Sequence, residues 1–341
     1  MSTIIETKGL SRVFQTYEKP QGLWNSIKGI WQRTYKQKVA LAPTDLKIER
    51  GQIVGLVGAN GAGKTTLLKL LSGLIFPSSG EAKVLGYTPW ERKGDYLRRI
   101  SILLGQKAQL WWDIPPVDSF ELLARIYDLD LKDARKRVDE LAGMLDCKHV
   151  LQTQLRRLSL GERMKMEIIG SLLHNPDMLF LDEPTIGLDV VAQVAIRNFI
   201  VKYSEQRSPT IILTSHYMDD IAKLADRLLL ISQGKIVYDG TVNEFTRTSE
   251  LLQRLQIQTA EPLAREIDLG NGLKLDAGAQ SFSLQLSAKE MPAAITRITS
   301  AATVQGLKIE EEDFEAVIHK FLEKESRLFS LSRDQQPRVS V

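Results

Sequence analysis

A glycine-rich stretch with one lysine is the part of this sequence best suited to bind phosphate. Residues 58–66 read GANGAGKTT, and the pattern G-x-x-x-x-G-K-[ST] is matched by Gly58, Gly63, Lys64 and Thr65. Glycines let the backbone curl so that several N–H groups converge on phosphate oxygens, and the lysine ammonium adds a full positive charge. This chemistry predicts that the chain binds a nucleotide.

Two adjacent acids follow an apolar run further along the chain. Residues 178–184 read MLFLDEP, so Asp182 and Glu183 come directly after four apolar residues. A carboxylate at the C-terminal end of a strand is placed to bind Mg²⁺ beside a triphosphate. The neighbouring glutamate can orient and activate an attacking water. The pair therefore predicts nucleotide hydrolysis as well as binding.

The residues on either side of the glycines predict the elements that hold them. The apolar run at 53–57, IVGLV, is typical of a buried strand. After the glycines, leucines recur at helical spacing until Gly73 ends the run. The positive end of such a helix favours a bound anion. A phosphate-binding loop between a strand and a helix is the context that the motif requires.

The rest of the first 245 residues alternates strands and helices. This order predicts an α/β fold with a parallel sheet, and residues 118–175 are rich in helical patterns. The expected strands are 3–14, 39–49, 53–57, 81–87, 100–104, 178–181, 210–213 and 227–231.

The sequence changes in character after about residue 245. Residues 246–325 predict a small α+β accessory domain, and residues 326–341 a disordered tail. The elements expected in the accessory domain are strands near 272–279, 281–287 and 307–310 and helices near 291–301 and 314–323.

A basic segment separates the first two expected strands. Residues 15–38 carry five basic residues against the single acid Glu18. Apolar side chains recur there at three- and four-residue steps, which predicts an amphipathic helix; they are Trp24, Ile27, Trp31 and Tyr35. Such a helix can lie at a membrane surface, against a partner or on its own domain, and the sequence leaves these alternatives open.

Composition limits the class of protein. A chain of 341 residues with 43% hydrophobic and 26% charged residues is expected to fold into two or three domains with a packed core. The single cysteine, Cys147, excludes an internal disulfide and is typical of a reducing compartment.

Charge and hydropathy limit the classes of partner. A net charge of +3 gives no argument for binding to nucleic acid. We see neither the layout of a signal peptide nor the ~18 apolar residues of a membrane span, so a partner is expected for any membrane role.

Further motifs resemble those of ATP-binding cassette (ABC) ATPases. Residues 158–162, LSLGE, are similar to the LSGGQ signature of that family. The other motifs follow in the family's order: GANGAGKTT, Gln106 after a strand, MLFLDEP, IGLD ending at Asp189, and His216 after TIILTS. The resemblance covers most of residues 1–245. It implies a P-loop NTPase cassette with a RecA-like core, an antiparallel β piece and a helical subdomain at about 107–175.

The resemblance implies a role for each matching residue. Glu183 would be the general base, Gln106 would reach Mg²⁺ and the attacking water, and His216 would touch the γ-phosphate. Thr65 and Asp182 would also bind Mg²⁺. The residues expected to hold ATP within this chain are Phe14 (stacked on adenine, with Tyr17 as the alternative), Gly58, Asn60, Gly61, Ala62, Gly63, Lys64, Thr65 and Thr66.

The signature motif implies a second copy of the cassette. Ser159 and Gly161 would cap the γ-phosphate held by that copy, and Asp189 would cross the same interface, so a head-to-tail homodimer is expected. Two residues depart from the family's pattern: Leu160 replaces a glycine and Glu162 a glutamine. Because a carboxylate repels a phosphate, we expect Glu162 to face the ribose hydroxyls.

The resemblance is to exporter-type members of the family. The segments GLIFPSSGEAKVLGYTPW and LDEPTIGLDVVAQ resemble exporter ATPases, and LGERMKMEIIGS stands where importers have GGQQQRVAIARA. This implies a peripheral motor on the cytoplasmic face of the inner (plasma) membrane, bound to separate transmembrane permease subunits. The alternatives are an importer ATPase and a soluble ABC ATPase without a transport role. Drugs, lipids and polysaccharides all remain open as cargo.

Two tryptophans follow Gln106 closely. Trp111 and Trp112 are expected to line the groove in which a cytoplasmic helix of the permease docks. The alternative is that both belong to the core of the helical subdomain.

Overall fold

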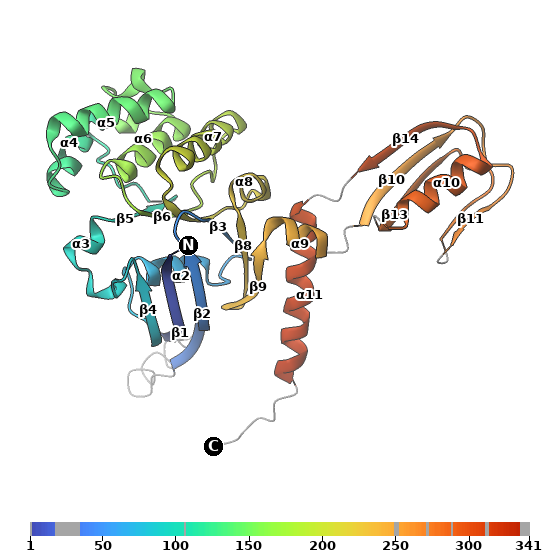
Figure 1. Cartoon of the computed structure of the whole chain (residues 1–341), viewed down its shortest axis with the longest axis horizontal. Coiled ribbons are helices and arrows are strands. Elements are labelled where there is room, and N and C mark those ends of the chain that lie inside the picture. The colour runs from blue at the N-terminus through green and yellow to red at the C-terminus, as the bar shows by residue number, and fades with distance from the viewer. Residues whose placement is uncertain are drawn as a thin grey trace, which may run out of the picture. The chain divides into compact units, whose positions relative to one another are not determined.

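The computed structural model describes residues 2–17, 35–105, 107–248, 252–270, 273–287, 289–310 and 314–334 (Figure 1). The chain divides into two compact units. One unit comprises residues 1–240 and 325–341, and the other residues 241–324. The division at Gly240 lies close to residue 245, where the composition changes.

A six-stranded sheet, ordered β5-β6-β7-β3-β8-β9, is the centre of the larger unit. Strands β5, β6, β7, β3 and β8 pair in parallel, and the expected α/β fold is thereby confirmed. Layers on both faces explain why these strands are almost entirely apolar. The strands are β3 (Ile53–Val57), β5 (Ile100–Leu104), β6 (Met178–Asp182), β7 (Thr210–Thr214), β8 (Arg227–Ser232) and β9 (Lys235–Thr241).

A second, antiparallel sheet contains the strands β2-β1-β4. These are β1 (Thr3–Tyr17), β2 (Tyr35–Glu49) and β4 (Ser79–Val84). Helix α2 (Lys64–Leu71) follows the glycine-rich loop, and its buried leucines share one hydrophobic core with Leu10 and Leu41 of this sheet. The same core includes Val54 of β3 and Phe180 of β6. Helix α2 is therefore held by both sheets.

Among the described residues, four α-helices lie between β5 and β7 in the chain. Three of them fall in the helical subdomain expected at about 107–175, and the fourth follows β6. They are α4 (Pro116–Ile126), α5 (Leu131–Met144), α6 (Leu160–Leu172) and α7 (Val190–Arg207). Figure 1 shows these four helices grouped together on one side of the larger unit. Short helices complete the unit: α3 (Gly94–Leu97), α8 (Met218–Leu224) and the 3-10 turns Pro89–Glu91, Lys148–Val150 and Leu155–Arg157.

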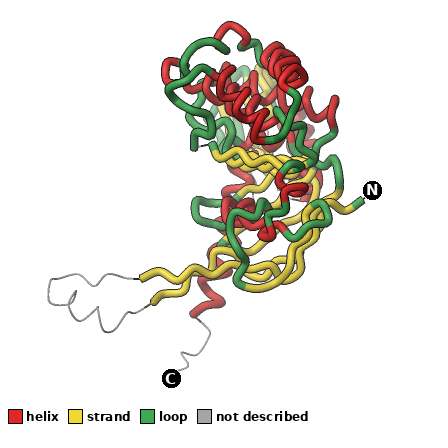
Figure 2. Tube along the Cα trace, turned by 90° about the vertical axis from the view of Figure 1, so that its left-hand side faces the viewer, coloured by secondary structure: helices red, strands yellow, loops and turns green. Residues whose placement is uncertain are grey.

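The basic segment begins and ends in strands rather than in a helix. Gln15 pairs with Gln37 and Tyr17 with Tyr35, so the β1–β2 ladder contains both ends of residues 15–38. Figure 2 shows the ends of two strands leaving the body of the unit as a ribbon. Placing Tyr35 on a helical face was wrong, because its backbone belongs to this ladder. Residues 18–34, with Trp24, Ile27 and Trp31, lie outside the described residues.

The smaller unit contains a three-stranded antiparallel sheet, β13-β10-β14, with a helix packed on one face. Strands β10 and β11 were not predicted; in them apolar and polar residues alternate over short runs. The elements are α9 (Val242–Thr248), β10 (Leu252–Thr259), β11 (Ile267–Gly270), β12 (Leu273–Leu275), β13 (Ser281–Ser287), α10 (Met291–Ala301) and β14 (Val304–Glu310).

The last helix, α11, extends over Phe314–Asp334. The tail expected at 326–341 is therefore wrong for residues 326–334, because the helical spacing of apolar residues continues beyond the expected end. Residues 335–341 lie outside the described residues. In the part of the chain that is described, no helix has the length and apolar character of a membrane span.

Candidate active site

The glycine-rich loop joins β3 to α2 and encloses the Lys64 side chain. The Lys64 Nζ donates hydrogen bonds to the carbonyl oxygens of Gly58 (2.6 Å) and Ala59 (3.4 Å). Gly63 has a φ of 119°, and a Cβ there would lie 2.5 Å from the Ala40 carbonyl oxygen. A side chain at this position is excluded by both the backbone conformation and the space, so the motif's second glycine is required.

Lys64 forms one electrostatic group with the two acids after β6. Only 6% of Lys64 is exposed. Burial lowers the pKa of its ammonium, and the charges of Glu183 and Asp182 oppose that change. Lys64 and the two acids, which are far apart in sequence, are thus close enough for their charges to interact.

Asp182, the last residue of β6, accepts hydrogen bonds from two threonines. Thr65 Oγ1 donates to Oδ2 (2.9 Å) and Thr214 Oγ1 donates to Oδ1 (2.8 Å). The same Thr214 hydroxyl accepts the N–H of Glu183 (3.0 Å). Thr214 therefore fixes both acids, although it was not among the predicted site residues. The available signal was a polar residue ending the apolar run TIIL, directly before Ser215 and His216.

Glu183 and His216 meet above the ends of β6 and β7. The Oε1 of Glu183 lies 2.9 Å from Nε2 of His216, and these side chains are 16% and 41% exposed. Glu183 has a φ of 56°, a strained conformation for a residue with a side chain. Gly105, at the end of β5, leaves room for it, because a Cβ there would lie 2.3 Å from the Glu183 carbonyl oxygen. The turn that carries Glu183 is held tightly by its neighbours.

The signature motif forms the first turn of α6. Ser159 is the N-cap, and its hydroxyl donates to Oε2 of Glu162 (2.7 Å) while accepting the Glu162 N–H (3.3 Å). The Ser159 N–H also donates to Oε2 (2.8 Å). The side-chain hydrogen bond from Ser159 lowers the pKa of the Glu162 carboxyl. This carboxylate is engaged by its own helix, and its contact with a ribose stays a prediction.

The signature adjoins the IGLD motif of the same chain. A Cβ on Gly161 would lie 2.9 Å from Cβ of Ala192, so the glycine lets α6 approach α7. Cδ2 of Leu160 lies 3.4 Å from the position that a Cβ on Gly187 would take. Asp189 is the N-cap of α7, and Oδ1 accepts the Ala192 N–H (2.8 Å). Ser159, Gly161 and Asp189 therefore form a second group of expected site residues, far from the phosphate loop in sequence. We call it the signature group.

The remaining expected residues have different surroundings. Phe14 lies in β1 opposite Lys38, and the guanidinium of Arg12 lies 4.6 Å from the centre of its ring. Tyr17 is the last residue of β1. Gln106 lies outside the described residues. The other loop residues are Asn60, which is exposed, Gly61, with a φ of 78°, Ala62, which is buried, and Thr66, which is half-buried in the first turn of α2.

Comparison with known proteins places the chain in a family. The family model described as ABC transporter matches residues 41–186. The ABC transporter ATP-binding protein NatA of Bacillus subtilis (strain 168) is 32% identical over 209 residues, which cover 61% of this chain and 85% of NatA. The daunorubicin resistance ATP-binding protein DrrA3 of Streptomyces coeruleorubidus is 35% identical over 214 residues, covering 62% and 67%.

A solved structure agrees with the sequence relatives. The cbiO1 protein of Clostridium perfringens, part of the ABC transporter complex cbiONQ, aligns with a TM-score of 0.60 and 25% identity. The alignment covers 73% of this chain and 93% of cbiO1. The chain therefore belongs to the ABC transporter family, as an ATP-binding subunit that hydrolyses ATP.

Proposed function

We propose that this chain is the motor of a membrane exporter whose transmembrane subunits are separate chains. The observation that carries the proposal is the meeting of Lys64, Asp182, Glu183 and His216 at the ends of β3, β6 and β7. The relationship to a daunorubicin resistance protein supports an exporter. Residues 1–245 act as the nucleotide-binding domain, and residues 246–325 as an accessory domain.

Each catalytic residue has a role that its contacts support. Lys64 leaves the carbonyl oxygens of its own loop and binds the β- and γ-phosphates of ATP. Glu183 accepts a proton from the attacking water as general base. His216, whose Nε2 lies 2.9 Å from Oε1 of Glu183, orients that carboxylate and touches the γ-phosphate. Phe14 of β1 stacks on the adenine.

The donor atoms near the phosphate loop fit Mg²⁺. Thr65 Oγ1 and Asp182 Oδ2 are 2.9 Å apart, and both are the hard oxygen ligands that this ion prefers. Within the described ranges no group of three or more His, Cys, Asp or Glu side chains gathers to hold a metal. This suits an ion that keeps waters and phosphate oxygens as most of its ligands. Mg²⁺ would neutralise phosphate charge, with Gln106 as a further ligand.

The signature group completes the site of a second copy. The Ser159 hydroxyl and N–H leave the Glu162 carboxylate and, with the Gly161 N–H, bind the γ-phosphate of the partner's ATP, so two chains associate head to tail. Exposed apolar side chains surround this group: Leu160 (44%), Val190 (72%) and Val191 (80%). Apolar side chains clustered on a surface favour a protein interface.

A groove between the core and the helical subdomain supports docking of a permease. It has a volume of about 420 Å³, and its lining includes Leu74, Ile126 and Tyr127. Ile126 is 65% exposed. Trp111 and Trp112 are 43% and 46% exposed, so neither is core, and neither is among the residues that line this groove. The guanidinium of Arg163 lies 4.9 Å from a ring centre of Trp112. A cytoplasmic helix of the permease docks on this side, which holds the motor at the inner face of the membrane.

Purified protein tests the proposal. Phosphate release should require both ATP and Mg²⁺, and sedimentation of the Glu183→Gln variant should show an ATP-dependent dimer. A chain that binds ATP but stays monomeric in that variant would contradict the head-to-tail arrangement. Reconstitution with permease subunits in vesicles then decides the direction of transport. Movement of cargo towards the side of the membrane on which ATP is bound would favour an importer.

A further inference from the structure

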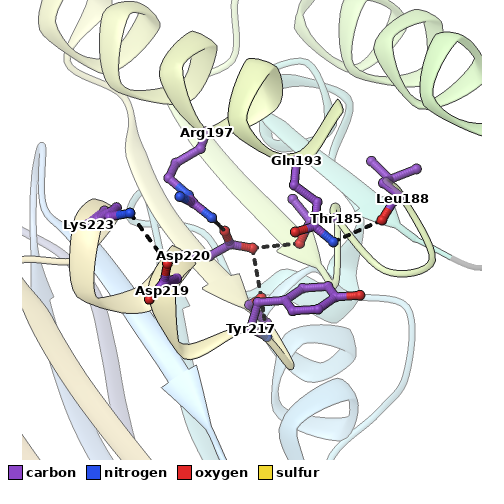
Figure 3. Close-up of polar contacts among 9 residues, drawn as sticks. Thr185, Leu188, Gln193, Arg197, Tyr217, Asp219, Asp220 and Lys223 are labelled. Carbon is purple, nitrogen blue, oxygen red and sulfur yellow. Dashed lines mark hydrogen bonds and ion pairs between the residues drawn. The ribbon is translucent and has the colours of Figure 1, made fainter. Parts of the chain in front are cut away.

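A buried carboxylate lies behind the catalytic turns. Asp220, in α8, is 1% exposed and accepts four hydrogen bonds (Figure 3). Arg197 donates to Oδ1 from Nε (2.9 Å) and Nη2 (2.6 Å). Thr185 Oγ1 (2.6 Å) and Ser215 Oγ (3.0 Å) donate to Oδ2. Every donor is itself nearly buried, so the group is a closed polar network.

Two of the four donors come from the turns that carry the catalytic side chains. Thr185 is two residues after Glu183, in the loop between β6 and α7. Ser215 directly precedes His216, after the end of β7. The Ser215 hydroxyl also accepts the N–H of Tyr217 (3.0 Å), so the residues on both sides of His216 are held. One carboxylate thus binds the loop of the general base and the loop of its histidine partner.

Helix α7 connects the same network to the IGLD motif. Figure 3 shows Gln193 and Arg197 side by side on this helix. The Gln193 Nε2 donates to the carbonyl oxygen of Leu188 (2.9 Å), the residue before Asp189. Figure 3 also shows the Arg197 guanidinium and the Thr185 hydroxyl converging on Asp220. Helix α7 therefore begins beside the expected subunit interface and contacts the Asp220 network through Arg197.

We propose that Asp220 is a positioning residue for ATP hydrolysis, which fixes Glu183 relative to His216 by binding the loop beside each. The inference rests on the proposed function of those two residues. Hydrogen bonds to one carboxylate oxygen are directional, so the two loops keep one spacing while Thr185 and Ser215 both donate. Misplacement of a catalytic group by about 1 Å costs on the order of 100-fold in rate.

Thr185→Val is the decisive variant, because it removes one hydroxyl and keeps the side chain's shape. The Arg197–Asp220 pair and the Ser215 hydrogen bond remain, so the chain should fold. We expect kcat for ATP hydrolysis to fall about tenfold, with the KM for ATP within twofold of that of the wild type. Thr185→Ser keeps the hydroxyl and should restore kcat to within twofold. Asp220→Asn should lower kcat further, with loss of thermal stability.

The neighbouring aspartate is the matched control. Asp219 lies in the same helix, forms an exposed pair with Lys223 (3.4 Å) and takes no part in the network (Figure 3). Asp219→Asn should leave kcat, KM and Tm unchanged. If Thr185→Val keeps the wild-type kcat, or if Thr185→Ser loses as much activity as Thr185→Val, the hydroxyl has no positioning role and the proposal is wrong.

A second measurement does not depend on activity. The chain has four histidines, and the His216→Gln variant identifies the ring resonances of His216 in an NMR spectrum. These resonances should move in Thr185→Val and stay in place in Thr185→Ser and Asp219→Asn. A wild type without ATPase activity would refute the proposed function, while the resonances still decide whether Asp220 positions the loop. Unmoved resonances in Thr185→Val would overturn the inference.

Discussion

The Nε2 of His216 lies 2.9 Å from Oε1 of Glu183. The contact exists because β6 and β7 are parallel neighbours in which Asp182 lies opposite Thr214, so the residues that follow each strand meet at one edge of the sheet. A general base must hold its carboxylate toward the attacking water in one orientation. In the role that we propose for Glu183, His216 and the Thr214 hydroxyl, which accepts the Glu183 N–H, would hold that orientation from the neighbouring strand.

Glu183→Gln should separate hydrolysis from binding. The amide keeps the size of the side chain and loses the base, so hydrolysis should fall by about 100-fold or more while the Kd for ATP stays within a few-fold. Phosphate release and the fluorescence of a bound ATP analogue measure the two effects. Retention of most of the activity would mean that another residue is the base.

Glu162→Gln should leave ATPase activity within a few-fold of the wild type. A glutamine at the third position of α6 can still accept from Ser159 and so preserve the capping box. Steady-state hydrolysis together with Tm tests this, with Glu162→Ala as the comparison that loses the Glu162 half of the capping box and keeps the Ser159 N-cap. A change on the order of 100-fold in Glu162→Gln would show that the carboxylate faces the γ-phosphate.

Gly161→Ala should destabilise the chain through a contact within it. The added Cβ would lie 2.9 Å from Cβ of Ala192, closer than two methyl groups can approach. Ala192→Gly removes the opposing atom, so the double variant should regain much of the Tm lost in Gly161→Ala. The two single variants are the controls for a double-mutant cycle. If the effects of the two changes on Tm simply add, the glycine is required for a reason other than its contact with Ala192.

Glu167 should make stability depend on pH. Its carboxylate, in α6, accepts the N–H of Gln109 (3.1 Å) and that of Leu110 (3.3 Å), and burial raises the pKa of this carboxyl. An acid with a raised folded-state pKa stabilises the fold below its unfolded pKa and loses that contribution as pH rises through the folded value. Above that value, the buried charge opposes folding.

Glu167→Gln removes this charge and keeps an acceptor for the two N–H groups. The Tm of the variant minus that of the wild type should therefore be more positive at pH 8 than at pH 5, as calorimetry can measure. Glu205, on the exposed side of α7, is the matched control, and Glu205→Gln should shift Tm equally at both pH values. An equal difference for Glu167→Gln at both values would contradict this pH dependence.

The local patterns predicted the central elements well, for a physical reason. A continuous apolar run such as 178–181 fits only a strand with both faces covered, and β6 has these residues. The glycines of residues 58–66 specify backbone conformations, and Gly63 has the left-handed conformation that its position requires. Residues 15–17 and 35–38 were placed wrongly because a strand pair formed by segments far apart in sequence outweighs a local helical spacing.

The sequence by itself determined the phosphate loop, the acids after β6 and the signature turn, since each motif is one continuous stretch whose residue types specify its own backbone and chemistry. Only the tertiary structure decided that Thr214 fixes both acids and that Asp220 joins Thr185 to Ser215. These contacts join side chains from different loops, and the order of the strands brings those loops together. No spacing along the chain encodes that order, because strand pairing is set by the packing of the whole sheet.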